Sequence, residues 1–213
     1  MNTKHGNSAR CLALLGVVAL AFGAIAALPR AAAAEAIVGQ PAPAFTLTDS
    51  NGAQRSLSDF QGKLVVLEWF NYDCPFVKKH YGSGNMQRLQ KKYTDQGVIW
   101  LSINSSAPGK QGNYPPEKMN ELAQEKHASP TAVLLDPDGT VGKAYGAKTT
   151  PHMFVIDQTG TLVYAGGIDD KPSTDQDDVK TARNHVDQAL IETIAGKPVS
   201  VSTSTPYGCS VKY

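Results

Sequence analysis

The sequence lacks an excess of charge of either sign. Its 20 Lys and Arg residues nearly balance 19 Asp and Glu residues, which leaves a formal net charge of +1 over 213 residues. The basic residues are scattered along the chain, so neither a nucleic-acid partner nor binding to an anionic membrane is indicated. The hydrophobic content of 41% instead suits one globular domain with a sizeable core.

The first residues have the composition of a secretory signal peptide. Basic residues precede an uncharged run over residues 11–28, and alanines fill residues 31–34. We expect residues 1–34 to be a signal peptide that is cut before Glu35 or Ile37, so that the protein is periplasmic or secreted. The apolar run is nearly long enough to cross a bilayer, so an N-terminal membrane anchor is the alternative.

Cysteine is scarce, with three residues in the whole chain. Removal of the signal peptide would take away Cys11 and leave Cys74 and Cys209 in an oxidising compartment. It would also remove three basic residues, so that 17 basic residues face 19 acidic ones and the net charge becomes about −2. The remaining two thiols allow a single intramolecular disulfide.

Histidine offers no close-spaced metal-binding pair. The four histidines beyond the signal peptide are His80, His127, His152 and His185. We therefore predict no metal site and no cofactor. A soft-metal site that joins Cys74 to His80 or His152 is the alternative to surface or supporting roles for these histidines.

The order of apolar and polar segments predicts a mixed α/β domain that ends in an extended tail. The run over residues 63–70 is typical of a central strand covered on both faces. Two hairpins are expected, one near the N-terminus and one late in the chain. The expected strands are 44–48, 54–57, 63–70, 98–104, 131–135, 153–156 and 161–164; the expected helices are 76–93, 116–126, 141–145 and 181–194; the tail is 195–213.

Cys74 is placed by this pattern between the central strand and the following helix. Pro75 suits the first turn of that helix. Free backbone N–H groups and the positive end of the helix dipole favour an anion there, so the thiolate of Cys74 should be stabilised. Lys78 and Lys79, one turn further, could add to this effect. An inert core cysteine is the alternative.

Three separated motifs resemble a known family. They are Glu-Trp-Phe-Asn-Tyr-Asp-Cys-Pro-Phe-Val at 68–77, Thr-Thr-Pro-His-Met-Phe-Val-Ile-Asp at 149–157, and the terminal Gly-Cys-Ser-Val-Lys-Tyr at 208–213. Together they resemble the thioredoxin-like superfamily, within it the alkyl hydroperoxide reductase and thiol-specific antioxidant (redoxin) group, and in particular its peroxiredoxin-like members. The resemblance implies a thioredoxin-like domain over residues 35–195 with a central mixed sheet flanked by helices, followed by a tail over residues 196–213 that carries Cys209.

The resemblance also implies roles for the two thiols. Cys74 matches the attacking cysteine of the superfamily's C-x-x-C motif, whereas Val77 stands where the second cysteine would be. Cys209 is then the candidate for the resolving thiol. A permanent structural disulfide or an unpaired thiol on the tail are the alternatives.

Further site residues follow from the same resemblance. Thr150 and Pro151 resemble the cis-proline loop that offers its backbone to a bound peptide, and with Pro75 they form the implied substrate-binding set. Glu68 takes the place of a buried acid beneath the active site. A carboxyl on so apolar a strand should have a raised pKa and could accept and return a proton. The alternative is an outward-facing or simply paired glutamate.

These features predict a periplasmic thiol–disulfide oxidoreductase that uses disulfide- or thiol-containing substrates, proteins or small molecules, together with an external thiol reductant or oxidant. A peroxiredoxin-like peroxide reductase is the first alternative, although Leu67 and Asn71 replace the Pro and Thr that peroxiredoxins place before their reactive cysteine. A non-enzymatic copper-binding or assembly protein that uses Cys74 with a histidine or methionine is the second. No nucleic-acid partner and no membrane contact of the mature protein are expected.

Overall fold

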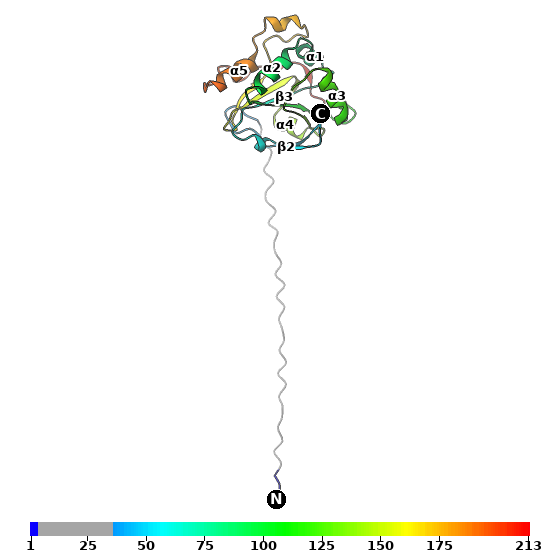
Figure 1. The fold of residues 1–213 in the computed structure, drawn as a ribbon, viewed down its shortest axis with the longest axis vertical. Coiled ribbons are helices and arrows are strands. Elements are labelled where there is room, and N and C mark those ends of the chain that lie inside the picture. Colours follow the sequence, from blue (N-terminus) through cyan, green and yellow to red (C-terminus); the bar gives the residue numbers. More distant parts are fainter. Residues whose placement is uncertain (4–35) are drawn as a thin grey trace. The chain divides into compact units, whose positions relative to one another are not determined.

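The computed structural model describes residues 1–3 and 36–213 (Figure 1). The predicted signal peptide, with Cys11, therefore lies outside the described residues except for its first three. Within the described part of the chain, no helix is both long and apolar enough to cross a membrane.

A seven-stranded mixed sheet forms the centre of the domain, in the order β2-β1-β5-β4-β3-β7-β8. The three central strands β5, β4 and β3 run parallel, whereas β1 and β7 flank them in the antiparallel direction. The strands are β1 (Thr46–Asp49), β2 (Gln54–Ser56), β3 (Val65–Trp69), β4 (Ile99–Asn104), β5 (Ala132–Leu135), β7 (His152–Ile156) and β8 (Leu162–Gly166). The expected hairpins β1–β2 and β7–β8 are confirmed.

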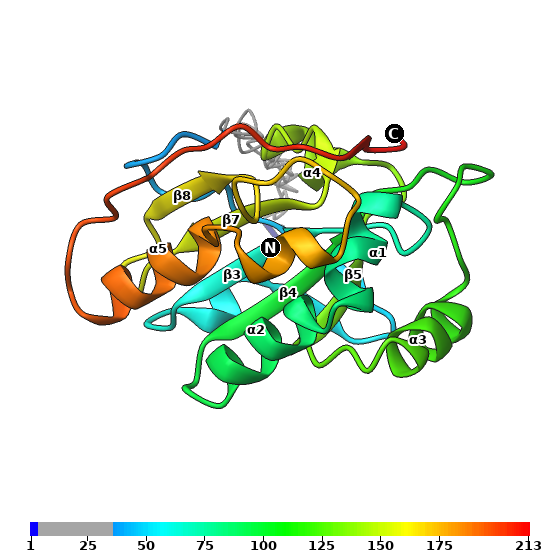
Figure 2. The same ribbon diagram turned by 90° about the horizontal axis from the view of Figure 1, so that it is seen from above.

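Helices cover both faces of this sheet, so the described domain has three layers. One apolar cluster packs between the sheet and α1 (Pro75–Gly82), α2 (Asn85–Thr94), α3 (Pro116–Glu125) and α5 (His185–Ile194). A second cluster lies on the other face beneath α4 (Thr140–Ala144). Figure 2 shows α2 and α5 on one side of the strands and α4 on the other. Short 3-10 turns at Leu57–Phe60 and Asp177–Lys180 complete the helical elements of this region.

Strand β3 is covered on both faces, as its sequence predicts. All five of its residues are buried. Val65, Leu67 and Trp69 pack into the cluster beneath α4, whereas Val66 packs towards α1 and α2. Because side chains alternate along a strand, Glu68 also faces α1 and α2.

Two helix predictions were wrong at their boundaries. The helix expected over 76–93 is two helices, α1 and α2, because Gly84 adopts a left-handed conformation with φ 73° that an α-helix cannot contain. The last helix begins at His185 rather than Thr181, because Asn184 caps it and accepts a hydrogen bond of 2.8 Å from the backbone N–H of Asp187.

The C-terminal tail is extended and folded back on the domain. After α5 it passes β8 and ends beside α4 (Figure 2). Its residues Cys209–Ser210 form strand β9, which pairs antiparallel with β6 (Thr149–Thr150). Cys209 lies opposite Thr150 in this register. The tail is therefore part of the folded structure around Thr150.

Candidate active site

Cys74 occupies the N-cap position of α1, with Pro75 as the first helical residue. The loop after β3 is held by Asn71, whose side-chain oxygen accepts from the Asp73 N–H at 2.9 Å and whose carbonyl accepts from the Cys74 N–H at 3.0 Å. The Cys74 side chain has no exposed surface, whereas the neighbouring Pro75 is exposed. The expected place of Cys74 between strand and helix is thus confirmed.

The structure brings Cys209 into contact with Cys74 across 135 residues of sequence. Their Sγ atoms are 2.7 Å apart, and Cys74 Sγ also lies 3.1 Å from the carbonyl oxygen of Thr150. Both cysteines are free thiols here. A disulfide has an S–S distance of about 2.0 Å, so the two thiols lie close enough to be joined by a bond once an oxidant removes two electrons and their protons.

The two thiols have pKa values shifted in opposite directions. Burial acts to raise the pKa of Cys74, but interactions with Cys209, Thr150 and the backbone N–H of Val77 outweigh it and leave the pKa below its ordinary value. Burial and the adjacent Cys74 raise the pKa of Cys209 to about 11. As pH rises, Cys74 therefore loses its proton before Cys209 does. The structure thus places a more acidic thiol, Cys74, against a less acidic one, Cys209.

The Thr150–Pro151 peptide bond is cis, as the resemblance to the cis-proline loop implies. Both residues are buried beside Cys74, and the backbone of Thr150 pairs with that of Cys209. Gly208 makes this approach possible, since a Cβ there would overlap the carbonyl oxygen of Thr150. Its φ of 143° is also one that L-residues rarely adopt.

Glu68 is fully buried on the face of the sheet that carries α1, so the outward-facing alternative is wrong. Its carboxylate accepts four hydrogen bonds, of which the Trp100 indole N–H and the Ser102 hydroxyl are the shortest at 2.8 Å each. The Tyr81 hydroxyl and the Gln90 amide donate the others at 3.0 and 3.1 Å. Burial raises the pKa of Glu68 despite these bonds, as expected. None of these four hydrogen bonds joins Glu68 to a cysteine sulfur, so the acid–base role of Glu68 stays a prediction.

The expectation that Lys79 supports the Cys74 thiolate was wrong. Lys79 is buried and its ammonium group donates to the carbonyl of Lys171 at 2.7 Å, with the Asp169 carboxylate 3.7 Å away. Its ammonium group therefore interacts with the loop after β8 and not with the Cys74 sulfur. Lys78 is exposed to solvent.

The histidines considered for a soft-metal site are both engaged elsewhere. His80 Nδ1 lies 2.9 Å from the amide nitrogen of Asn85, and its Nε2 lies 3.2 Å from the hydroxyl of Tyr207. His152 Nδ1 accepts from the Lys148 N–H at 3.3 Å. Both are buried rather than on the surface. Among the residues with a described position, no group of three or more His, Cys, Asp or Glu could hold a metal ion.

The sequence reasoning missed how firmly the tail is attached. Besides the β6–β9 pairing, the N–H of Val211 donates to the Lys148 carbonyl at 3.1 Å, and the Tyr213 hydroxyl donates to the Ala147 carbonyl at 2.8 Å. The ring of Tyr213 fills space that two glycines of the α4 region, Gly139 and Gly142, leave open. The aromatic residues on either side of Cys209 were the available signal.

Comparison with known proteins places this geometry in a family. The family model described as AhpC/TSA matches residues 38–165. The thiol-disulfide oxidoreductase ResA of Geobacillus thermodenitrificans is 30% identical over 126 residues, which cover 59% of this chain and 66% of that protein. The match therefore spans just under two thirds of this relative's length.

Two further similarities bear on activity and fold. A putative peroxiredoxin bcp of Coxiella burnetii is 29% identical over 137 residues, which cover 62% of this chain and 83% of that protein. A solved structure of a conserved protein from Geobacillus kaustophilus superimposes with a TM-score of 0.71 at 29% identity, covering 83% of this chain and 92% of that one. The fold of the described residues is thioredoxin-like, as the mixed sheet and the structural neighbours show.

Proposed function

Because the chain belongs to the AhpC/TSA family, we propose that it is a thiol–disulfide oxidoreductase in which Cys74 is the nucleophile and Cys209 the resolving thiol. The observation that carries the proposal is the 2.7 Å contact between the two sulfurs, with the pKa of Cys74 lowered and that of Cys209 raised. Similarity to a thiol-disulfide oxidoreductase supports the same chemistry.

The exchange takes place in two steps. The Cys74 thiolate attacks one sulfur of a substrate disulfide; that S–S bond breaks, a disulfide between Cys74 and the substrate forms, and the second substrate sulfur leaves as a thiolate and takes up a proton. Cys209 then loses its proton and attacks Cys74 Sγ. The mixed disulfide breaks, the Cys74–Cys209 bond forms, and the first substrate sulfur leaves. Two electrons pass to the substrate, and an external dithiol reverses the steps to regenerate the protein.

The surrounding residues supply the positioning and the proton transfer. In the proposal, Thr150 and Pro151 present backbone to an extended substrate segment, and the exposed Pro75 borders the approach to Cys74. Glu68 is the buried acid–base group beneath the site. Support for this role is its raised pKa and its hydrogen bond with Tyr81, a residue of the same helix α1 that Cys74 begins.

Peroxide reduction is the second candidate, favoured by the similarity to a putative peroxiredoxin. Cys74 would then pass through a sulfenic acid that condenses with Cys209 and releases water. The surroundings of Cys74 favour disulfide exchange instead. Asn71 stands where peroxiredoxins have Thr, and its amide is occupied by the Asp73 N–H and the Gln111 carbonyl. Leu67 is buried on the opposite face of the sheet.

Export to the periplasm completes the proposal and rests on the composition of residues 1–34. We expect protein recovered from a periplasmic fraction to begin at Glu35 or Ile37 and to lack Cys11. N-terminal sequencing tests this expectation. Recovery in membranes alone, with Met1 intact, would contradict it and favour the anchor.

A single-turnover comparison tests the reaction class. Reduced protein is mixed in separate experiments with a small disulfide and with hydrogen peroxide, and loss of the Cys74 thiol is followed in time. The proposal predicts faster reaction with the disulfide. A Cys74 that reacts far faster with peroxide would replace the proposal by the peroxidase, and a Cys74 that reacts with neither would remove both.

A further inference from the structure

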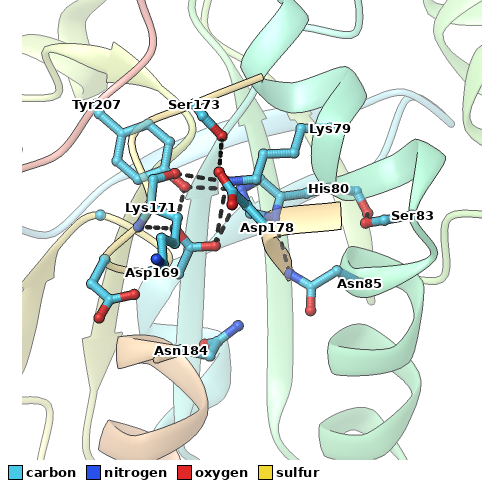
Figure 3. A network of polar contacts seen from close by, with 12 residues as sticks. Lys79, His80, Ser83, Asn85, Asp169, Lys171, Ser173, Asp178, Asn184 and Tyr207 are labelled. Carbon is cyan, nitrogen blue, oxygen red and sulfur yellow. Dashed lines mark hydrogen bonds and ion pairs between the residues drawn. The ribbon is translucent and has the colours of Figure 1, made fainter. Parts of the chain in front are cut away.

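A largely buried polar cluster joins helix α1 to the tail (Figure 3). We call it the tail latch and define it as Lys79 and His80 from α1, Asp169 from the loop after β8, and Tyr207 from the tail. Lys79, His80 and Asp169 are buried, with 1%, 0% and 3% of their surfaces exposed. The exchange steps described above use none of these four residues.

Tyr207 is the member of the tail latch that connects it to the tail. Its hydroxyl donates to the Asp169 carboxylate and lies 3.2 Å from His80 Nε2. Its ring packs edge-on against Phe76 with centroids 5.9 Å apart, and the Lys79 ammonium lies 5.5 Å from the ring centroid. Three of these four contacts are with residues of α1, so Tyr207 ties the tail mainly to the helix that Cys74 begins.

The hydrogen bonds around Tyr207 form an ordered chain. The Arg88 guanidinium donates to the side-chain oxygen of Asn85 at 2.7 Å, so the Asn85 amide nitrogen can donate to His80 Nδ1 at 2.9 Å. A neutral His80 then carries its proton on Nε2 and donates it to the Tyr207 hydroxyl, which itself donates to Asp169. Each donor in this series of hydrogen bonds has one acceptor. The Tyr207 hydroxyl of the tail therefore accepts from His80 and donates to Asp169.

The tail needs such an anchor because its pairing with the domain is short. Strands β6 and β9 contain only two residues each, and pairing of that length is weak by itself. Tyr207 precedes Cys209 by two residues, so fixing Tyr207 keeps the Cα of Cys209 within about 7 Å of it. Along α1, Lys79 lies about 7.5 Å from Cys74. Helix α1 therefore carries both Cys74, at its start, and the residues that bind Tyr207 of the tail.

We propose that Tyr207 is a positioning residue, held by the tail latch, that places Cys209 on Cys74 and keeps Cys74 covered until the tail is released. The proposal rests on the proposed function, because it concerns how the resolving thiol is presented. In the latched state Cys74 has no exposed surface, and the backbone of Thr150 is paired with Cys209 of β9. An external disulfide reaches Cys74 when the latch opens, and closure returns Cys209 for the second step.

Alkylation of Cys74 by iodoacetamide tests the latch without any need for redox activity. The variants are Tyr207→Phe, which removes only the hydroxyl, and Tyr207→Ala, which also removes the ring, each in the full chain with Cys209→Ser. Tyr145→Phe is the matched control, because it removes a buried tyrosine hydroxyl that donates to the Pro43 carbonyl at 2.7 Å on the other face of the sheet. The labelled Cys74 peptide is quantified by mass spectrometry.

We expect alkylation to become about 10-fold faster in Tyr207→Phe, the effect of losing a hydrogen bond to a charged group, and faster again in Tyr207→Ala. Tyr145→Phe should alkylate as the parent does. With Cys209 restored, the equilibrium constant for the Cys74–Cys209 disulfide in a glutathione buffer should fall by a similar factor in both Tyr207 variants.

Unchanged alkylation and an unchanged disulfide equilibrium in Tyr207→Phe would overturn the latch. If Tyr207→Ala fails to fold, Tyr207→Phe alone decides. Equal acceleration in Tyr145→Phe would also overturn it, because the effect would then be general loosening of the fold. If the latch variants alkylate faster while wild-type Cys74 does not exchange with a small disulfide, the proposed function fails and the latch stands.

Discussion

Cys74 and Cys209 lie in contact, but the region around Cys74 is built differently from the tail that carries Cys209. Cys74 is fixed by the core, because it follows a fully buried strand and begins a helix that packs on the sheet. Cys209 depends on a two-residue strand, one glycine and the contacts of Tyr207 and Tyr213. In the proposed reaction, a fixed core position suits Cys74 as the attacking thiol, and a tail held by few contacts suits Cys209, which must make room for substrate.

Replacing each cysteine by serine should separate the two regions most strongly. Cys74→Ser should abolish disulfide exchange, because it removes the thiol at the start of α1, where the helix stabilises a thiolate. Cys209→Ser should leave the first attack intact and trap the mixed disulfide, since the resolving thiol is gone. Single-turnover reaction with a small disulfide, followed by mass spectrometry, measures both. Full activity of Cys74→Ser would remove the thiol mechanism.

Glu68→Gln tests whether the buried carboxyl near Cys74 takes part in exchange. We expect exchange to slow by ~10² to 10⁴-fold, as for loss of a positioned acid or base. A glutamine can keep the bonds from Trp100, Ser102 and Gln90 through its oxygen and donate to the Tyr81 hydroxyl through its nitrogen, so the fold should persist. Exchange at the wild-type rate would mean that Glu68 is structural.

The same variant makes a prediction about stability with a definite sign. Burial raises the folded-state pKa of Glu68 above the unfolded value, so its favourable contribution is present below about pH 4.5 and is lost as pH rises through the folded pKa. Gln does not ionise. The free energy of unfolding at pH 7 should therefore be larger in Glu68→Gln than in the wild type, measured by denaturant titration. A lower value would contradict the raised pKa.

Gly208→Ala sharpens the tail side. The added Cβ would overlap the Thr150 carbonyl oxygen, so β9 should leave β6 and the Cys74–Cys209 disulfide should become roughly 100-fold less favourable in a glutathione buffer. Gly196→Ala is the control, because Gly196 also has a left-handed φ, of 67°, but nothing lies within 4 Å of the added Cβ. Equal effects of the two substitutions would show that backbone strain, not the close approach, is responsible.

Lowering the pH should weaken the tail latch, with a smaller effect than the substitutions above. Burial, with the neighbouring Lys79, lowers the pKa of His80 to about 4 despite Asp169, so the folded state favours the neutral ring. A histidine in the unfolded chain takes up a proton near pH 6.5. The contribution of neutral His80 to the free energy of unfolding is therefore fully present above that pH and is lost as pH falls towards 4. We expect His80→Gln to remove on the order of 2 kcal/mol of this dependence, measured from unfolding at several pH values. His152, whose pKa burial also lowers to about 4, remains in both proteins as an internal reference. Identical pH profiles of the two proteins would contradict the assignment.

The region around Cys74 could be predicted from sequence, because the residues that determine it follow one another in the chain. The apolar run of β3, Cys74 and Pro75 follow one another directly, and they specify a buried strand, a helix start and a thiol between them. The raised pKa of Glu68 followed from its place in that run. The cis bond before Pro151 came from family resemblance, since composition does not determine it.

The tail side was largely hidden from sequence because its contacts are long-range. Lys79 looked like a partner for a thiolate five residues away, yet it binds the carbonyl of Lys171, 92 residues later. Tyr207 carries no motif, and its meaning depends on His80 and Asp169 arriving from two other elements. Which buried groups a tail reaches depends on the packing of the whole domain.

Peptide mapping without reductant tests the central claim, that Cys74 and Cys209 form a redox pair, most directly. Reduced protein is treated with one equivalent of a small disulfide, quenched with acid, digested and analysed by mass spectrometry. The account predicts a peptide that joins Cys74 to Cys209, with release of both halves of the small disulfide as thiols. A stable mixed disulfide on Cys74 with Cys209 still free would contradict it.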